Sequence, residues 1–238
     1  MAEAIVFLPG ILSDARVFGP QIAELSAQYA VMSLPLCVDD TVAAMATRAL
    51  ALMPTQFALV GAGLGGVVAM EILRIAPQRV TRLCLIATSP LQKVPLDPVA
   101  YEPLLVAARS GRMEEVVVQL AGHDPDKAQV MDADVLALLQ DMAMAIGVSG
   151  FVNQVRAVQR QEDMQSVLRR SNCPTQIIFG LDDPFIMPKR YETLAAFIPD
   201  AQLTGLAHAS VVPSLEAPAE VTQAIESWMA RPLVLRQS

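Results

Sequence analysis

Four loops in this sequence carry residues whose types and spacing could support chemistry, and each loop follows an apolar run typical of a buried strand. Residues 9–12 read Pro-Gly-Ile-Leu, and residues 61–66 read Gly-Ala-Gly-Leu-Gly-Gly. Asp183 and His208 lie in the two later loops. A histidine oriented by a carboxylate is a general base, and it can activate a hydroxyl, a thiol or a water molecule.

The glycine-rich loop has the spacing of a sharp turn between a strand and a helix. Gly61, Gly63 and Gly65 alternate with larger residues, and an apolar helical pattern follows directly. A turn of this kind lifts its central residue beyond the edge of the sheet, where a side chain could attack a substrate. Gly63 has no side chain, so no covalent intermediate can form on it.

The elements that must position these loops alternate between strand and helix. Strands that alternate with helices predict an α/β fold, a doubly wound and mostly parallel sheet with right-handed crossovers. We expect the second strand at one edge, followed by the first, third, fourth, fifth and sixth. The expected strands cover residues 4–8, 29–34, 57–60, 82–87, 175–179 and 202–206, and the expected helices cover residues 15–26, 41–53, 64–75, 191–197 and 221–229.

The alternation lapses in the middle of the chain. Residues 91–170 show apolar residues at helical spacing throughout, which predicts a helical cap inserted between two strands of the sheet. The core then comprises residues 1–90 and 171–238. The methionines of the cap are consistent either with the lining of an apolar ligand site or with an ordinary core. They are Met113, Met131, Met142 and Met144.

Taken together, the loops resemble those of the α/β-hydrolase family, in particular its small, capped members, and the resemblance covers essentially the whole chain. The family's nucleophile elbow is G-x-S-x-G, and residues 61–65 match it except for the serine. Its acid follows a late strand as G-x-x-D, which Gly180 and Asp183 match. Its histidine precedes an E-x-P motif, as His208 precedes residues 216–218. The family's order of elbow, acid and histidine is kept.

The resemblance implies a role for each matched residue. Gly63 occupies the nucleophile position, and the backbone N–H groups of Ile11 and Leu64 form the oxyanion hole. Asp183 is the triad acid and His208 is the base. We therefore expect one ring nitrogen of His208 to donate a hydrogen bond to Asp183, and the other to face the space above Gly63.

Other residues compete for two of these roles. Asp182 is the alternative to Asp183 as the acid. Ser13, Cys37 and Ser89 each follow a strand at the same edge of the sheet, so each is a candidate to replace the missing nucleophile. Cys37 has the intrinsically better nucleophile, because a thiolate is more reactive than a hydroxyl.

Two functions are compatible with this pattern. The first is an esterase-like hydrolase that acts on a small apolar ester, thioester or carbon–carbon bond, with Asp183 and His208 activating water directly. The second is a non-catalytic protein that binds a ligand in the same pocket. If His208 is the base, Gly63→Ser alone should create esterase activity, because a nucleophile and its base act as a unit.

Composition narrows the remaining possibilities. The chain of 238 residues is 53% hydrophobic, with a net charge of −7 and no basic face, which argues against nucleic acid as a partner. Its three cysteines stand singly, and no metal-binding spacing occurs. The glycines at 61–66 also spell a dinucleotide motif, but residues 87–89 after the next strand offer no acid for a ribose, so we expect no cofactor.

Neither the first ten residues nor the uncharged segment 49–70 has the pattern of a targeting or membrane-spanning sequence. The first ten residues carry an acidic group and reach a proline at position 9, unlike a secretion signal. The uncharged segment 49–70 contains one proline and four glycines, which would break a spanning helix. We therefore expect a cytoplasmic protein with a small-molecule ligand and no membrane association.

Overall fold

The core of the protein is a six-stranded sheet in which every neighbouring pair of strands is parallel. The computed structural model describes residues 3–89, 98–122 and 131–233. The strand order β2-β1-β3-β4-β5-β6 confirms the predicted topology. The strands are β1 (Ala4–Leu8), β2 (Val31–Ser33), β3 (Phe57–Ala62), β4 (Val80–Ile86), β5 (Thr175–Gly180) and β6 (Ala201–Leu206).

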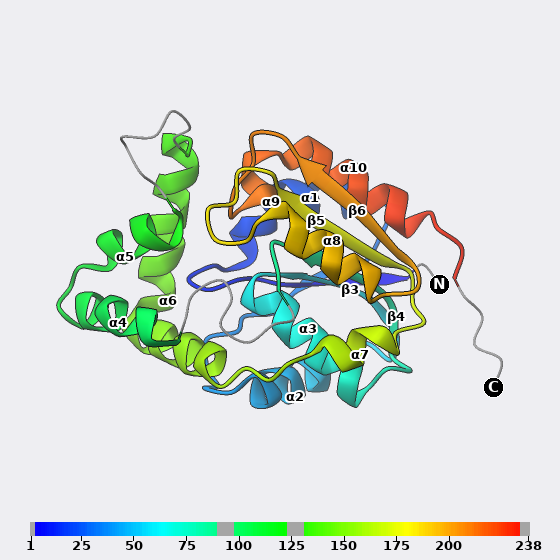
Figure 1. Cartoon of the computed structure of the whole chain (residues 1–238), viewed down its shortest axis with the longest axis horizontal. Helices are drawn as coiled ribbons and strands as arrows, with labels where there is room; N and C mark the ends of the chain where they lie inside the picture. Colours follow the sequence, from blue (N-terminus) through cyan, green and yellow to red (C-terminus); the bar gives the residue numbers. More distant parts are fainter. Residues whose placement is uncertain (1–2, 90–97, 123–130, 234–238) are drawn as a thin grey trace.

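Helices cover both faces of this sheet (Figure 1). One face carries α1 (Gly19–Leu25) and α10 (Pro218–Met229), which pack on each other, and the other carries α2 (Val42–Leu52) and α3 (Leu64–Ile75). The fully buried Trp228 of α10 donates its indole N–H to the carbonyl of Pro174 at 2.9 Å. The central strands are therefore buried on both sides, which explains their nearly continuous apolar sequences.

The carboxyl ends of the strands come together at one edge of the sheet. Leu8 of β1 pairs with Gly61 of β3, and Ala62 pairs with Ile86 at the end of β4. On the far side, Gly180 of β5 pairs with Leu206 of β6. The loops that follow these strands are those singled out in the sequence, and ligands of open parallel sheets bind at this edge.

The helical insertion lies between β4 and β5 and covers this edge (Figure 1). The longest of its helices, α6, bends at Gly147, whose φ of 69° and ψ of 174° are not helical. By length and hydropathy α6 is also the one candidate membrane span among the described residues. Phe151 and Gln154 of α6 are fully buried in the protein. The helices are η2 (Pro98–Tyr101), α4 (Glu102–Arg109), α5 (Met113–Leu120), α6 (Ala133–Gln159) and α7 (Gln165–Arg169).

Some predicted boundaries were wrong. The helix expected over residues 15–26 is a short 3-10 turn, η1 (Ala15–Phe18), followed by α1, because Pro20 begins a new helix and cannot donate a backbone hydrogen bond within an existing one. The strand expected over residues 29–34 shortens to β2, because only these three residues pair with β1.

Candidate functional site

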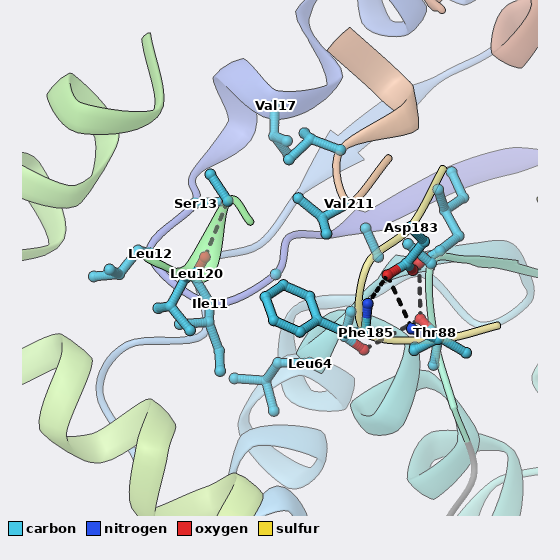
Figure 2. Close-up of a pocket in the computed structure, with 18 of the residues that line it drawn as sticks. Ile11, Leu12, Ser13, Val17, Leu64, Thr88, Leu120, Asp183, Phe185 and Val211 are labelled. Atoms are coloured by element: carbon cyan, nitrogen blue, oxygen red, sulfur yellow. Dashed lines mark hydrogen bonds between the residues drawn. The ribbon is translucent and has the colours of Figure 1, made fainter. Parts of the chain in front are cut away.

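A cavity of about 160 Å³ lies between the carboxyl edge of the sheet and the cap. Its walls are mostly apolar, with the elbow and the loop after β1 on one side and residues 183–186 and 211–214 on the other (Figure 2). Among the described residues, no lysine, arginine or histidine lines it. The cap contributes Tyr101, Val117, Leu120, Ala121, Leu139, Val158 and Gln161.

The elbow is built as a strained strand-to-helix turn. Gly63 has a φ of 49° and a ψ of −116°, a conformation that side chains rarely adopt, and its N–H donates to the carbonyl of Ile86 at 3.0 Å. A Cβ on Gly63 would meet nothing closer than 3.8 Å, whereas a Cβ on Gly65 would lie 1.9 Å from the carbonyl oxygen of Leu8. Gly65 is thus required by packing, while the position of Gly63 has room for a side chain.

Both expected oxyanion donors lie at the cavity. Leu64 is the first residue of α3 and Ile11 follows β1, and both line the cavity. Neither backbone N–H has a hydrogen-bond partner among the described residues. The N-terminus of α3 adds a favourable field for a carbonyl oxygen. The pair of N–H groups that the sequence predicted as an oxyanion hole is therefore free to bind an acceptor.

The structure places Asp183, and not the exposed Asp182, at the cavity. Oδ1 of Asp183 accepts the N–H groups of Phe185 at 2.8 Å and Ile186 at 3.0 Å, and Oδ2 accepts the hydroxyl of Tyr191 at 3.1 Å. Burial raises the pKa of the Asp183 carboxyl above its ordinary value, against the lowering effect of these three hydrogen bonds. All of its described partners are neutral, so the carboxylate has no cationic partner.

His208 does not occupy the expected position. Its side chain is exposed, it does not line the cavity, and no hydrogen bond joins it to Asp183 within the described part of the chain. The carbonyls of Leu206 and Ala209, on either side of it, accept the N–H groups of residues 181 and 182 at 2.9 and 3.1 Å. The two residues between these anchors turn outward, with a φ of 62° at His208. The structure therefore does not bring the side chain of His208 to Asp183, in contrast to the pairing expected from the sequence.

Val211 lies on the cavity wall instead (Figure 2). The carboxylate of Glu216 fixes this part of the loop, because it accepts the N–H groups of Ser210 at 3.0 Å and Val212 at 2.9 Å, one on each side of Val211. The E-x-P motif thus organises residues 210–212 and leaves His208 outside. In the sequence, the spacing to the E-x-P motif, and not the presence of a histidine, is the signal that identifies Val211 as the residue at the cavity.

The structure also shows where the three candidate replacement nucleophiles lie. Ser13 and Ser89 line the cavity, and the hydroxyl of Ser13 donates to the carbonyl of Ile11 at 3.1 Å. Cys37 is not part of the lining; its carbonyl accepts the side-chain amide of Asn153 at 3.2 Å. Since no described histidine lines the cavity, neither serine there has an imidazole to activate it. Within the same residues, no group of three or more metal-binding side chains occurs.

The methionines of the cap, which the sequence offered as candidates to line a ligand site, do not face the cavity. None of the four singled out in the sequence lines the cavity; Met142 is fully buried in the core and Met144 is 65% exposed. A polar contact ties the cap to the core instead. The buried side chain of Gln154 accepts the N–H of Leu12 through Oε1 at 2.9 Å. Leu12 has a φ of 52°, so this hydrogen bond supports an unfavourable backbone conformation beside Ile11.

Solved structures with the same architecture are abundant. The enol-lactonase from Burkholderia xenovorans LB400 superimposes with a TM-score of 0.86 at 20% identity, over 97% of this chain and 92% of that one. A thermophilic esterase from Thermogutta terrifontis gives 0.83 at 21% identity, over 96% and 90%. The bromoperoxidase from Bacillus anthracis gives 0.83 at 16% identity, over 97% and 93%. At these identities the likeness establishes the fold alone.

Comparison of the sequence itself places the chain in a family. No curated protein sequence matches it. The model of the family described as "Alpha/beta hydrolase family" matches residues 5–224, which include the elbow, Ile11, Asp183 and the loop after β6. The chain therefore belongs to the α/β-hydrolase family.

Proposed function

We propose that this protein binds a small, mostly apolar molecule in the cavity between core and cap without hydrolysing it. The observation that carries the proposal is that Gly63 and Val211 stand on the cavity wall, so the elbow presents no nucleophilic side chain and no described histidine faces the ligand to activate one. The N–H groups of Ile11 and Leu64 remain available to hold an acceptor oxygen. Such a site keeps the binding part of a hydrolase and lacks its acid–base chemistry.

Hydrolysis by water, activated through Asp183 and His208, is the competing function. It is favoured by one observation, namely that Asp183 lies at the cavity in a partly buried environment. A general base must come within hydrogen-bond reach of the proton that it removes, directly or through one water molecule. The exposed His208 lies outside the cavity lining, so the geometry supports binding better than turnover.

Binding and turnover can be measured on the same protein. We expect methyl hexyl ketone and nitrophenyl butyrate to raise the melting temperature, by about 5–10 °C at roughly a hundredfold excess over Kd. We expect no hydrolysis of the ester above the rate in buffer. Ala62→Phe, which fills the cavity beside the elbow, should abolish the thermal shift. The same substitution at the exposed Ala137 of α6 is the matched control and should leave the shift intact.

The two functions give opposite outcomes. Hydrolysis by the wild-type protein that disappears in both Asp183→Asn and His208→Ala would establish the catalytic alternative. Absence of any shift with ketone and ester alike would reject the proposed binding function.

A further inference from the structure

One polar group in the cavity wall has no partner. Tyr101 is the last residue of η2, at the start of the described part of the cap, and its side chain lines the cavity with 0% exposure. Its hydroxyl makes no hydrogen bond. Burial alone raises the pKa of the Tyr101 phenol to about 12, so it is neutral and can both donate and accept.

An unpaired buried hydroxyl is unusual and costly. Most buried polar side-chain atoms have a partner, because water is removed without compensation otherwise. The other fully buried tyrosine follows this rule, since Tyr191 donates its hydroxyl to Asp183. Tyr101 is at the boundary of a ligand-sized cavity, so its missing partner can be supplied by the molecule that fills that cavity.

The core side of the cavity carries two further polar groups without a partner among the described residues. They are the backbone N–H of Ile11, in the loop after β1, and that of Leu64, at the start of α3, and the surface of the cavity is mostly apolar. We propose that the Tyr101 hydroxyl is a second polar anchor, so that the ligand carries a hydrogen-bonding oxygen at its cap end and a carbonyl oxygen at α3. This inference rests on the proposed binding function and specifies its ligand.

The charge of the wall specifies the ligand further. Asp183 is the carboxyl group on the described wall, and no described cationic side chain accompanies it there. An anionic ligand would lie near this carboxylate without a compensating charge, which is costly in an apolar cavity. The ligand class is therefore a neutral aliphatic compound with a carbonyl and a separate hydroxyl or ether oxygen, such as a hydroxyketone.

The test uses matched probes in place of the natural ligand. Methyl ketones with about five to nine carbons are titrated by calorimetry, each beside the analogue that carries a terminal hydroxyl group. At the chain length that spans both anchors, we expect the hydroxyketone to bind about tenfold more tightly than its parent ketone. Tyr101→Phe should remove that preference, so that each hydroxyketone binds no more tightly than its parent ketone.

Two further variants separate recognition from structure. Tyr101→Phe removes a hydroxyl that makes no hydrogen bond, so the free protein should melt at the wild-type temperature or higher. Tyr191→Phe removes a formed hydrogen bond and should lower the melting temperature. Tyr29→Phe, at a partly exposed site outside the cavity lining, should keep the wild-type preference for hydroxyketones.

Failure of the second anchor and failure of the proposed binding function give different results. If ketones bind but no hydroxyketone binds more tightly than its parent, or if Tyr101→Phe retains the preference, the second anchor is wrong and the binding function stands. If no ketone of the series binds the wild-type protein, the proposed function and this inference both fall.

Discussion

The double variant Gly63→Ser/Val211→His should hydrolyse nitrophenyl acetate at least about a thousandfold faster than the wild-type protein, whereas each single variant stays near the buffer rate. A serine nucleophile and its histidine base act as a unit, so one without the other is worth little. The elbow has room for the serine side chain, and Val211 shares the cavity wall with Asp183, which would orient the new imidazole. Steady-state kinetics with the four proteins, wild type included, measures the effect.

Additional substitutions in the double variant identify the groups that act. Asp183→Asn should lower the new activity by orders of magnitude, because the imidazole loses the carboxylate that orients it. His208→Ala should change nothing, because His208 lies outside the cavity lining. If Gly63→Ser alone is as active as the double variant, and His208→Ala abolishes that activity, then His208 reaches the elbow and the placement of Val211 is irrelevant to catalysis.

Gly65→Ala should destabilise the protein far more than Gly63→Ala. The new Cβ at position 65 would lie 1.9 Å from the carbonyl oxygen and 2.5 Å from the carbonyl carbon of Leu8, so β1 and α3 must separate. We expect a loss of about 4 kcal/mol or more in the free energy of unfolding. Gly63→Ala meets no steric obstacle and should cost only about 1–2 kcal/mol, from its positive φ. Urea denaturation of both variants measures the difference.

Equal losses in the two glycine variants would contradict this ranking. They would mean that conformational strain at Gly63, rather than contact between β1 and α3, limits the stability of the elbow. The comparison also tests whether lack of space excludes a side chain from position 63. A tolerated alanine at position 63 shows that a side chain fits there, which is a precondition for the serine of the double variant.

The topology of the sheet could be predicted from the sequence because its strands are short apolar runs separated by helical patterns. β1 and β3 are buried along almost their whole length, so their sequences are nearly continuous in apolar residues. The edge strand β2 is partly exposed and pairs on one side only, and its predicted length was wrong for that reason. Local pattern thus identifies buried strands better than edge strands.

The site could be predicted only in part. Gly63 directly follows β3, and Asp183 lies three residues beyond β5, so the sheet determines where they lie. In the loop after β6, Val211 lies five residues beyond the strand. The path of this loop depends on the carboxylate of Glu216 and on carbonyl groups that bond to the neighbouring loop. These are contacts between distant residues, and residue type alone pointed to His208.

The residues with which the cap lines the cavity were not identified from the sequence, because its helices carry apolar residues on several faces.

The hydrogen bond from Leu12 to Gln154 has a kinetic consequence. It is buried and joins the cap helix α6 to the loop after β1, which carries Ile11. A cap that opens by moving α6 must break this bond and release the strained backbone of Leu12, so ligand entry and exit both cross that barrier. Because binding through an opening cap requires a conformational change, association should be slow, and a bound molecule should have a long residence time. If the protein binds its ligand without turnover, as we propose, that lifetime sets how quickly it can respond.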